Sequence, residues 1–341
     1  MVEPITILAI ESSCDDTSAA VLKNHTVFSN VIASQKVHEE FGGVVPELAS
    51  RAHQQNIIPV VDQAIKSAGI RKTDIDAIAY TKGPGLLGSL LVGSSFAKGL
   101  SSGLDIPLIE VNHMQAHILA HLIDGNNSEN SKPNFPFLCL TVSGGHTQIV
   151  RVDSPLKLEV IGKTLDDAAG GAFDKVAKIL GLPYPGGPLI DKYAVNGNEL
   201  TYSFPISKVD ELNFSFSGLK TAFLYFIRDE MQQDEKFIDN NLANICASIQ
   251  YTIVSTLLRK LQKAVKQTGI TEVAIAGGVS ANSSLRGALI SLGQEYNWNV
   301  FIPKFEYCTD NAAMIGIVGM YKYKEKQFAS LLSKPEARLS F

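Results

Sequence analysis

The strongest constraint on the fold of this chain is an internal duplication. Residues 7–10 and residues 138–142 are apolar runs, and each leads through a short polar turn into another apolar run. Residues 77–80 and 273–276 are apolar as well, and each of these runs leads into glycines and then into a helical pattern. Because one plan occurs twice in the chain, the sequence predicts two structurally similar α/β halves.

The two halves differ in length. The first and second apolar runs begin 70 residues apart in the front half and 135 residues apart in the back half. The back half therefore carries about 65 additional residues, and insertions of that size tend to serve function. We expect this insertion, at about 163–235, to be helical, with Asp166 or Asp167 capping one helix and Asp191 on the next.

Domain boundaries follow from the same pattern. The polar segment 124–133 separates the halves, which predicts an N-terminal lobe at 1–130 and a C-terminal lobe at 131–310. We expect the last segment, about 311–341, to return to the N-terminal lobe. Residues 237 to about 266 carry apolar side chains at three- and four-residue steps, which predicts a long amphipathic helix that forms part of the core.

Composition excludes several classes of protein. With 341 residues, 45% hydrophobic and 19% charged, the chain can bury two ordinary cores. Its four cysteines lie far apart, so neither a disulfide framework nor a cysteine zinc site is indicated, which fits a cytoplasmic protein. The chain starts without the basic region of a signal peptide, and no apolar run reaches membrane-spanning length. Because the net charge is −4, any RNA contact requires a local basic patch or a partner.

A pair of histidines marks a candidate metal site. Asn112 is a good N-cap residue, and it opens a short helix that carries His113 and His117 four residues apart. Two imidazoles at this spacing lie on one helical face and can share a metal ion. Most such pairs are only surface or packing residues, however, so spacing alone does not decide. The apolar residues of this helix should dock it and leave the histidine face free.

Two small turns suggest a nucleotide-binding cleft. Ser12–Ser13 and Ser143–Gly145 each follow an apolar strand, and such turns can leave backbone N–H groups free to bind an anion. A Gly277–Gly278 corner after another strand would let a flat ring approach the backbone. Alternatively, each glycine serves only its own turn. The chain has no G-x-x-x-x-G-K-[ST] motif, so it is not a P-loop protein.

Over nearly its whole length the chain resembles the universal family of tRNA N6-adenosine threonylcarbamoyltransferases, formerly named glycoprotein endopeptidases. The matching strings are residues 10–17 (IESSCDDT), 41–51 (FGGVVPELASR), 82–86 (KGPGL), 113–117 (HMQAH), 142–148 (VSGGHTQ), 166–170 (DDAAG), 172–175 (AFDK), 184–188 (YPGGP), 214–220 (FSFSGLK), 276–282 (AGGVSAN) and 308–311 (CTDN). The resemblance implies an actin/Hsp70/sugar-kinase fold with two ribonuclease-H-like lobes around an interdomain cleft. Departures are small: Gln115–Ala116 replaces a frequent Glu-Gly, and Gly171 a frequent Glu.

The resemblance also implies a set of functional residues. The implied metal ligands are His113, His117 and Asp310, whereas His121 has no place in the family pattern and is interpreted as structural. Two histidines and one carboxylate suit iron(II) or zinc. The implied substrate-binding residues are Thr141, Val142, Ser143, Gly144, Gly145, Asp174, Gly187, Asp191 and Asn282, with Ser12, Ser13 and His146 near the phosphate.

Three of these residues also have ordinary interpretations. Asp174, the implied catalytic residue that positions the donor, could be a solvated helix residue beside Lys175. Asp191 could be a carboxylate at a helix start, and Asn282 a helix cap. The resemblance favours the functional role for each.

The implied reaction transfers a threonylcarbamoyl group from threonylcarbamoyl-AMP to N6 of adenosine 37, next to the anticodon, in tRNAs that read codons starting with A. The product is the modified nucleoside t6A. The implied partners are tRNA, a paralogous dimerisation subunit and a small P-loop ATPase, with a separate synthase supplying the donor. No membrane partner is implied.

Three other classes stay open. A kinase or ATPase of the actin-like superfamily would share the cleft, but it would not need the two histidines and Asp310. A metallopeptidase of the H-E-x-x-H type would need Glu where the chain has Met114. A non-catalytic scaffold subunit would not need to retain the full metal triad.

Overall fold

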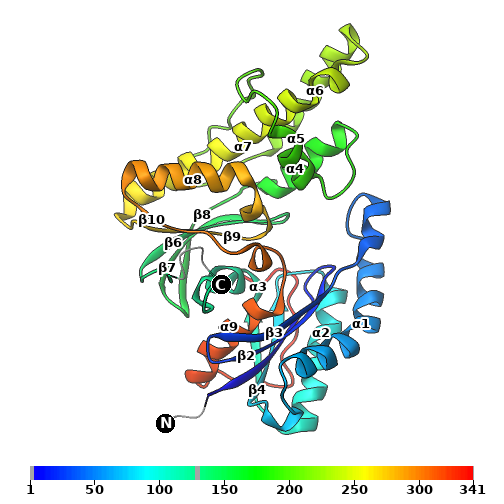
Figure 1. Cartoon of the computed structure of the whole chain (residues 1–341), viewed down its shortest axis with the longest axis vertical. Coiled ribbons are helices and arrows are strands. Elements are labelled where there is room, and N and C mark those ends of the chain that lie inside the picture. Colours follow the sequence, from blue (N-terminus) through cyan, green and yellow to red (C-terminus); the bar gives the residue numbers. More distant parts are fainter. Residues whose placement is uncertain (1–3, 127–130, 341) are drawn as a thin grey trace. The chain divides into compact units, whose positions relative to one another are not determined.

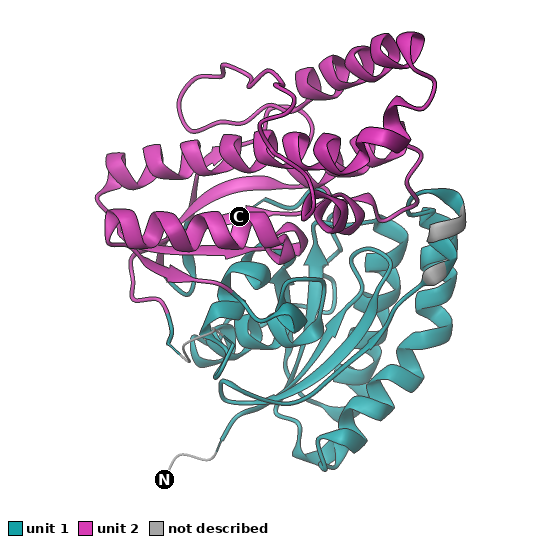
Figure 2. Cartoon of the chain, turned by 45° about the horizontal axis from the view of Figure 1, so that its top comes forward, with its two compact units in different colours: residues 1–132, 154–158, 303–341 teal, residues 133–153, 159–302 magenta. Residues whose placement is uncertain are grey.

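The chain divides into two compact units. The computed structural model describes residues 4–126 and 131–340, so part of the predicted boundary segment 124–133 lies outside the described residues. Unit 1 comprises residues 1–132, 154–158 and 303–341, and unit 2 comprises residues 133–153 and 159–302 (Figure 2).

Unit 1 is built on a five-stranded mixed sheet with the strand order β3-β2-β1-β4-β5. Figure 1 labels β3, β2 and β4 of this sheet. Strands β1 and β2 pair antiparallel, and β1 and β4 pair parallel with Ile7 opposite Ala77. The strands are β1 (Thr6–Glu11), β2 (Thr17–Lys23), β3 (Thr26–Ala33), β4 (Ala77–Gly83) and β5 (Leu108–Asn112).

Both faces of this sheet are covered, because alternate residues of the apolar strands point to opposite sides. Leu8 and Ile10 belong to a buried cluster shared with α1 and α2. On the other side α9 lies so close that a Cβ on Gly319 would come within 2.6 Å of Ala79 Cβ. The helices of unit 1 are η1 (Lys36–Phe41), α1 (Pro46–Ser67), η2 (Lys72–Asp74), α2 (Leu87–Leu104), α3 (His113–Leu119), η3 (Ala120–Leu122), η5 (Phe305–Tyr307) and α9 (Ala312–Lys324).

Unit 2 repeats the plan of unit 1, which confirms the predicted duplication. Its five-stranded sheet has the order β10-β9-β6-β7-β8, in which β6 pairs antiparallel with β7 and parallel with β9. Leu138 lies opposite Val273, as Ile7 lies opposite Ala77 in unit 1. The strands are β6 (Phe137–Val142), β7 (Thr147–Ser154), β8 (Lys157–Lys163), β9 (Glu272–Ala276) and β10 (Asn299–Phe301).

Three helices of unit 2, α4, α5 and α6, lie within the predicted insertion at about 163–235, and one predicted detail is corrected. The predicted cap of the first inserted helix is wrong: Ala168 stands at the N-cap of α4, and Asp166 instead accepts hydrogen bonds from the backbone and hydroxyl of Ser217 at the start of α6. The long helix predicted from residue 237 is α7. The helices are α4 (Ala169–Ile179), α5 (Gly186–Ala194), α6 (Ser217–Gln233), α7 (Phe237–Thr268), η4 (Gly278–Ala281) and α8 (Ser283–Tyr296).

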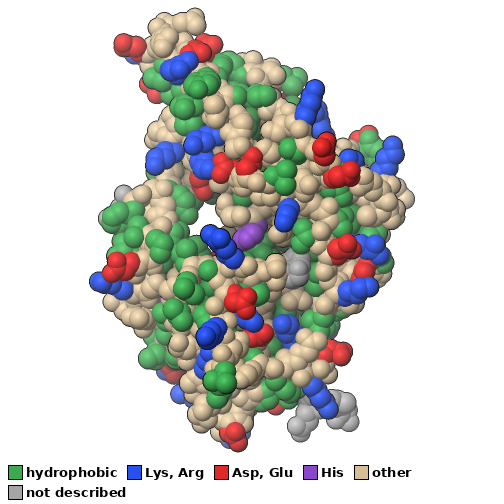
Figure 3. Space-filling view, turned by 180° about the vertical axis from the view of Figure 1, so that it is seen from behind, with side chains coloured by type: hydrophobic (Ala, Val, Ile, Leu, Met, Phe, Trp, Pro, Cys, Tyr) green, Lys and Arg blue, Asp and Glu red, His purple; other side chains and the backbone are tan. Residues whose placement is uncertain are grey.

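Two sequence expectations about the whole chain can be compared with the structure. Within residues 4–126 and 131–340, no helix combines the length and apolar character needed to cross a membrane. All four cysteines are in the thiol form. On the face drawn in Figure 3, Lys and Arg side chains are interspersed with Asp and Glu side chains.

Candidate metal centre and nucleotide-binding residues

The histidine-bearing helix α3 starts where β5 ends. Asn112 closes the strand, and its side-chain oxygen accepts hydrogen bonds from the backbone N–H groups of Met114 and Gln115, as the sequence predicted. All seven residues of α3 are buried. The histidine face is therefore buried, whereas the sequence predicted that it would be free.

The third candidate ligand comes from the far end of the chain. Asp310 precedes α9, whose N-cap is Asn311. Because α9 packs against the sheet of unit 1, its first turn reaches the start of α3. His113, His117 and Asp310 each offer an atom within 4.8 Å of the others. The fold thus brings together the three residues that the family resemblance implies as metal ligands.

The geometry of this triad suits a metal ion. Asp310 Oδ1 lies 3.4 Å from His113 Nε2 and 3.2 Å from His117 Nε2, so both imidazoles direct the same ring nitrogen at one carboxylate oxygen. The two rings are nearly perpendicular, with centroids 4.7 Å apart. Two neutral imidazole nitrogens and one carboxylate form a donor set for iron(II) or zinc that leaves coordination positions for other ligands.

Glu11 supports the triad, and the sequence analysis assigned it no role. It is fully buried at the end of β1, and its Oε2 lies 3.1 Å from His113 Nδ1. Thr81 donates a hydrogen bond to the same oxygen, and the backbone N–H of Ser13 donates to Oε1. A carboxylate on the second ring nitrogen is a common support of metal-binding histidines, because it fixes the ring so that Nε2 faces the metal.

The charges of this cluster act on one another strongly. Burial alone would lower the pKa of His113, but the carboxylates of Asp310 and Glu11 raise that pKa well above its ordinary value. Burial opposes ionisation of Asp310 and Glu11, yet their pKa values are lowered because both face His113. These carboxylates favour a positive charge at the triad, and a divalent cation would satisfy the same preference.

Replacing Glu11 with glutamine should weaken metal binding. Glutamine keeps the size of the side chain but loses the charge that orients His113, so we expect the metal dissociation constant to rise by about 10- to 100-fold. The measurement is a chelator-competition titration of the full chain with Zn²⁺. Glu110→Gln is the control, because Glu110 pairs with Lys82 and not with the triad. Equal affinities of the Glu11→Gln and wild-type proteins would contradict the prediction.

The first predicted phosphate turn does not present the groups that we expected. Ser12 and Ser13 are both buried. The Ser13 N–H is used by Glu11, its hydroxyl lies 3.2 Å from His113 Nδ1, and the Ser12 hydroxyl donates to the carbonyl of Ser89. Ser12 and Ser13 therefore serve the interior of unit 1.

The second predicted phosphate turn is open. Thr141 and Val142 end β6 inside the core, and the following turn is closed by a 2.8 Å hydrogen bond from the Ser143 N–H to the carbonyl of His146. Gly144 and Gly145 are exposed, and a Cβ on either would meet nothing within 4 Å. This turn is free to approach a ligand.

Asp174 links two helices of unit 2. Its Oδ1 accepts hydrogen bonds from the backbone N–H groups of Gly186 (2.9 Å) and Gly187 (3.3 Å), so this carboxylate on α4 caps the start of α5. Lys175, the next residue in the sequence, forms an ion pair with Asp167 instead of Asp174. Burial raises the pKa of Asp174, and the two backbone N–H groups oppose that rise. No partner of Oδ2 is found among the described residues.

Asp191 and Asn282 meet at the start of α8. Asp191 accepts hydrogen bonds from both the backbone N–H and the hydroxyl of Ser283. Asn282 is the N-cap residue of α8, and its Oδ1 accepts from the Leu285 N–H while its Nδ2 donates to Gln250 Oε1 at 2.7 Å. The helix-cap interpretation of Asn282 is thus correct. Both residues border one part of unit 2, although they are 91 positions apart in the sequence.

Solved structures of other proteins share this fold. Full-length HypF, in a phosphate- and nucleotide-bound form, matches 96% of this chain and 48% of its own length with a TM-score of 0.64 and 16% sequence identity. Component A of the (R)-2-hydroxyglutaryl-CoA dehydratase from Acidaminococcus fermentans matches 95% of this chain and 99% of its own length, with a TM-score of 0.52 and 15% identity. The duplicated sheets place the chain in the actin/Hsp70/sugar-kinase class of folds, with a two-histidine, one-carboxylate cluster in its first unit.

Sequence comparison identifies the family within this class. The family model described as tRNA N6-adenosine threonylcarbamoyltransferase matches residues 26–317. Proteins of that name from Christiangramia forsetii and Porphyromonas gingivalis are 65% and 58% identical to this chain, and the alignments cover at least 99% of each sequence. The chain belongs to the tRNA N6-adenosine threonylcarbamoyltransferase family, a family of transferases that act on tRNA and for which a metal ion is implied.

Proposed function

We propose that this protein transfers the threonylcarbamoyl group of threonylcarbamoyl-AMP to N6 of adenosine 37 in tRNAs that read codons starting with A, forming t6A. The bond from N6 to the carbamoyl carbon forms, the bond from that carbon to the phosphate oxygen breaks, AMP leaves, and one proton of N6 is released to solvent. The observation that carries the proposal is the convergence of His113, His117 and Asp310 in a chain 65% identical to a named member of the family. A kinase or peptidase activity would not explain why this triad occurs in a member of this family.

The donor is a mixed anhydride and already activated, so the reaction needs placement and charge stabilisation rather than a protein nucleophile. In the proposal, the open turn at Ser143–Gly145 binds the nucleotide phosphate with Thr141 and Val142 behind it, and His146 lies beside it. Asp191 and Asn282 bind the nucleoside, and Asp174 with Gly187 positions the donor. A bound iron(II) or zinc ion would supply Lewis-acid stabilisation of the threonylcarbamoyl oxygens.

The proposed partners follow from the family and from charge. The chain has a net charge of −4, and its acidic and basic side chains are interspersed on the face drawn in Figure 3, which favours weak tRNA binding by this chain alone. We therefore include a paralogous dimerisation subunit and a small P-loop ATPase in the proposal, together with a separate synthase that supplies threonylcarbamoyl-AMP. The proposed location is the cytoplasm.

A reconstituted transfer reaction tests the proposed function. Purified chain is incubated with threonylcarbamoyl-AMP, unmodified tRNA and the two partner subunits, and nucleosides from the digested tRNA are separated by chromatography. We expect t6A to form with adenosine at position 37 and not with guanosine at that position. If no t6A forms, and the purified chain without the partner subunits hydrolyses ATP or phosphorylates a small molecule, the chain is a kinase or ATPase. Failure of both assays, with cleavage of a protein substrate, would favour a peptidase.

A side chain on the open turn should block donor binding without unfolding the protein. Gly145 has space for a Cβ and lacks a positive φ, so Gly145→Val places its branched side chain where the phosphate would approach. We expect affinity for a non-hydrolysable threonylcarbamoyl-adenylate analogue to fall by about tenfold or more, the scale of a lost charge-assisted contact, with little change in melting temperature. Calorimetric titration and thermal unfolding measure the two quantities.

Gly170→Ala is the contrasting variant. Its Cβ would lie 2.5 Å from the carbonyl oxygen of Ser143, so it should lower the melting temperature by displacing the turn. If a folded Gly145→Val protein binds the analogue as well as the wild type does, the turn is only structural.

A further inference from the structure

The turn that joins β1 to β2 is held in place by two helices of unit 1. From α1, His53 Nε2 lies 3.0 Å from the carbonyl oxygen of Cys14. From α2, the hydroxyl of Ser89 donates to the same carbonyl at 2.9 Å. The N–H of Leu86, the residue before α2, donates to the carbonyl of Ser13 at 2.7 Å. Two successive carbonyl groups of the turn are therefore fixed by residues far away in the sequence.

His53 uses both of its ring nitrogens in this arrangement. A carbonyl oxygen can only accept a hydrogen bond, so Nε2 carries a proton and donates it to Cys14. The side chain is fully buried, and burial lowers the pKa of His53, which favours the neutral ring. In a neutral ring Nδ1 is then an acceptor, and the hydroxyl of Thr17, 2.8 Å away, donates to it. His53 thus attaches α1 to the turn and to the start of β2.

The same turn supports the candidate metal centre. The N–H of Ser13 donates to Glu11 Oε1, and the Ser13 hydroxyl oxygen lies 3.2 Å from His113 Nδ1. When Nε2 of His113 binds a metal ion, Nδ1 carries the ring proton, and Glu11 Oε2 and the Ser13 oxygen are its acceptors. Ser13 therefore touches both the ligand and the carboxylate that orients the ligand, so a shift of Ser13 would disturb both.

We propose that His53 is a positioning residue of the metal centre. By holding the Cys14 carbonyl it fixes the adjacent Ser13, and Ser13 together with Glu11 orients His113. The hydrogen bonds that His53 makes among the described residues are with Cys14 and Thr17, so it acts through the backbone of the turn and not on the metal. This inference rests on the proposed function, because that function includes the metal ion.

Two substitutions of His53 separate its two hydrogen bonds. The amide nitrogen of glutamine lies as many bonds from Cα as Nε2 of histidine, so His53→Gln keeps a donor for the Cys14 carbonyl. The amide oxygen of asparagine lies as many bonds from Cα as Nδ1, so His53→Asn keeps an acceptor for Thr17 but loses the donor for Cys14. If the Cys14 contact positions the metal centre, only the asparagine variant should be impaired.

Metal binding by the full chain is the measurement. The Zn²⁺ dissociation constant is obtained by chelator competition, and the visible absorption of the Co²⁺-loaded protein reports the ligand geometry. For His53→Asn we expect the Zn²⁺ dissociation constant to rise by about tenfold, the lower end of the range for a lost supporting contact, together with a changed Co²⁺ spectrum. For His53→Gln we expect both quantities to stay near the wild-type values.

Ser89→Ala tests the same turn from the other helix. It removes the second donor to the Cys14 carbonyl by deleting one buried hydroxyl, so Zn²⁺ binding should weaken by about threefold or more. This variant decides the case if His53→Asn does not fold: an unchanged Zn²⁺ affinity would then overturn the proposal. His25→Asn is the matched control, because His25 packs against Tyr321 and makes no hydrogen bond with the turn among the described residues. Its Zn²⁺ affinity should equal that of the wild type.

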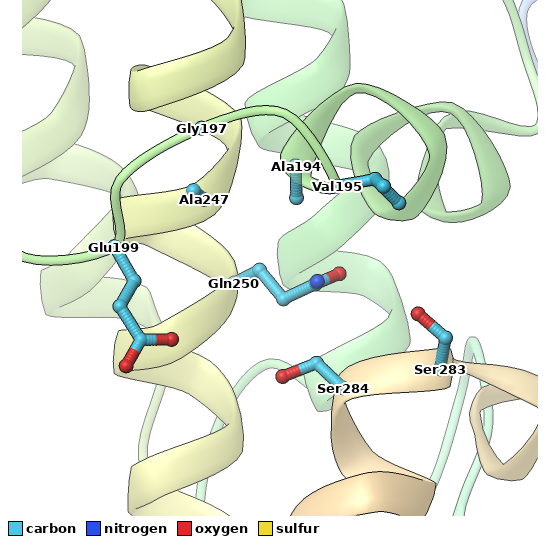
Figure 4. Close-up of a pocket in the computed structure, with 8 residues that line it drawn as sticks. All are labelled: Ala194, Val195, Gly197, Glu199, Ala247, Gln250, Ser283 and Ser284. Atoms are coloured by element: carbon cyan, nitrogen blue, oxygen red, sulfur yellow. The ribbon is translucent and has the colours of Figure 1, made fainter.

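Unit 2 provides an internal control for a general loss of structure. A pocket of about 260 Å³ lies beside Asp191, and Figure 4 shows Gln250 extending from α7 towards the start of α8, which carries Ser283 and Ser284. All residues that line this pocket lie between positions 194 and 284. The AMP affinity of metal-free His53→Asn, measured by calorimetry, should therefore equal that of the metal-free wild type.

The outcomes separate this inference from the proposed function. If His53→Asn is less stable but binds Zn²⁺ with wild-type affinity and gives the wild-type Co²⁺ spectrum, His53 has only a structural role. A parallel fall of Zn²⁺ and AMP affinities would likewise overturn the positioning role, because it indicates a global change. In both cases metal binding and t6A formation by the wild type leave the proposed function intact. If the wild type itself binds neither Zn²⁺ nor Co²⁺, the metal assignment fails and this inference fails with it.

Discussion

His113→Ala should remove the metal and the transfer activity together while the protein stays folded. The side chain offers Nε2 to the triad, and its polar and ring contacts among the described residues are with Glu11, Ser13, His117 and Asp310. Because a lost supporting carboxylate already costs about 10- to 100-fold in metal affinity, the loss of a ligand should cost more than about 100-fold. Metal content is measured by elemental analysis, transfer by t6A formation in single turnover, and folding by circular dichroism.

His121→Asn is the matched control for this experiment. His121 continues the histidine row of α3 but is fully buried in η3 and is not part of the triad. We expect the replacement of this buried side chain to lower the melting temperature, whereas metal content per folded protein should stay at the wild-type level. Near-stoichiometric iron or zinc in folded His113→Ala protein would overturn the metal assignment.

The local sequence predicted those features in which the interacting residues lie close together in the chain. Asn112 caps α3 through residues two and three positions away, and the i, i+4 spacing of His113 and His117 places both rings on one face. The duplication was also visible, because residues used to align the two halves become register partners in each sheet. These features depend on periodicity and on short-range hydrogen bonds.

Long-range partners were not predictable from local pattern. Asp310 lies 193 residues after His117, so only the family resemblance joined it to the histidines. Asp166 looked like the cap of the helix that follows it, yet its partners lie about 50 residues away in Ser215–Ser217. A signal for Glu11 was present, since a carboxylate that directly continues an apolar strand must be buried and must find a partner.

The two backbone hydrogen bonds that Asp174 accepts determine how its role must be tested. Asparagine at this position keeps an Oδ1 that can accept from Gly186 and Gly187, so the cap of α5 survives in Asp174→Asn while the charge is lost. Alanine removes the cap as well, and should cost about 1 kcal/mol of stability. The two variants therefore separate the structural role of Oδ1 from the role of the charge.

If Asp174 positions the donor, Asp174→Asn should lower adenylate affinity modestly and the single-turnover transfer rate by about 100-fold or more, the scale of a lost catalytic group. Asp167→Asn is the control. Asp167 precedes α4, forms an ion pair with Lys175 of that helix and makes no hydrogen bond with Gly186 or Gly187 among the described residues. Transfer by this variant should therefore stay near the wild-type rate. Equal and small rate losses in the two asparagine variants would remove Asp174 from the site and leave it as the cap of α5. A large loss confined to Asp174→Asn, with an unchanged melting temperature, requires the charge itself, because asparagine retains every hydrogen bond that the carboxylate makes within unit 2.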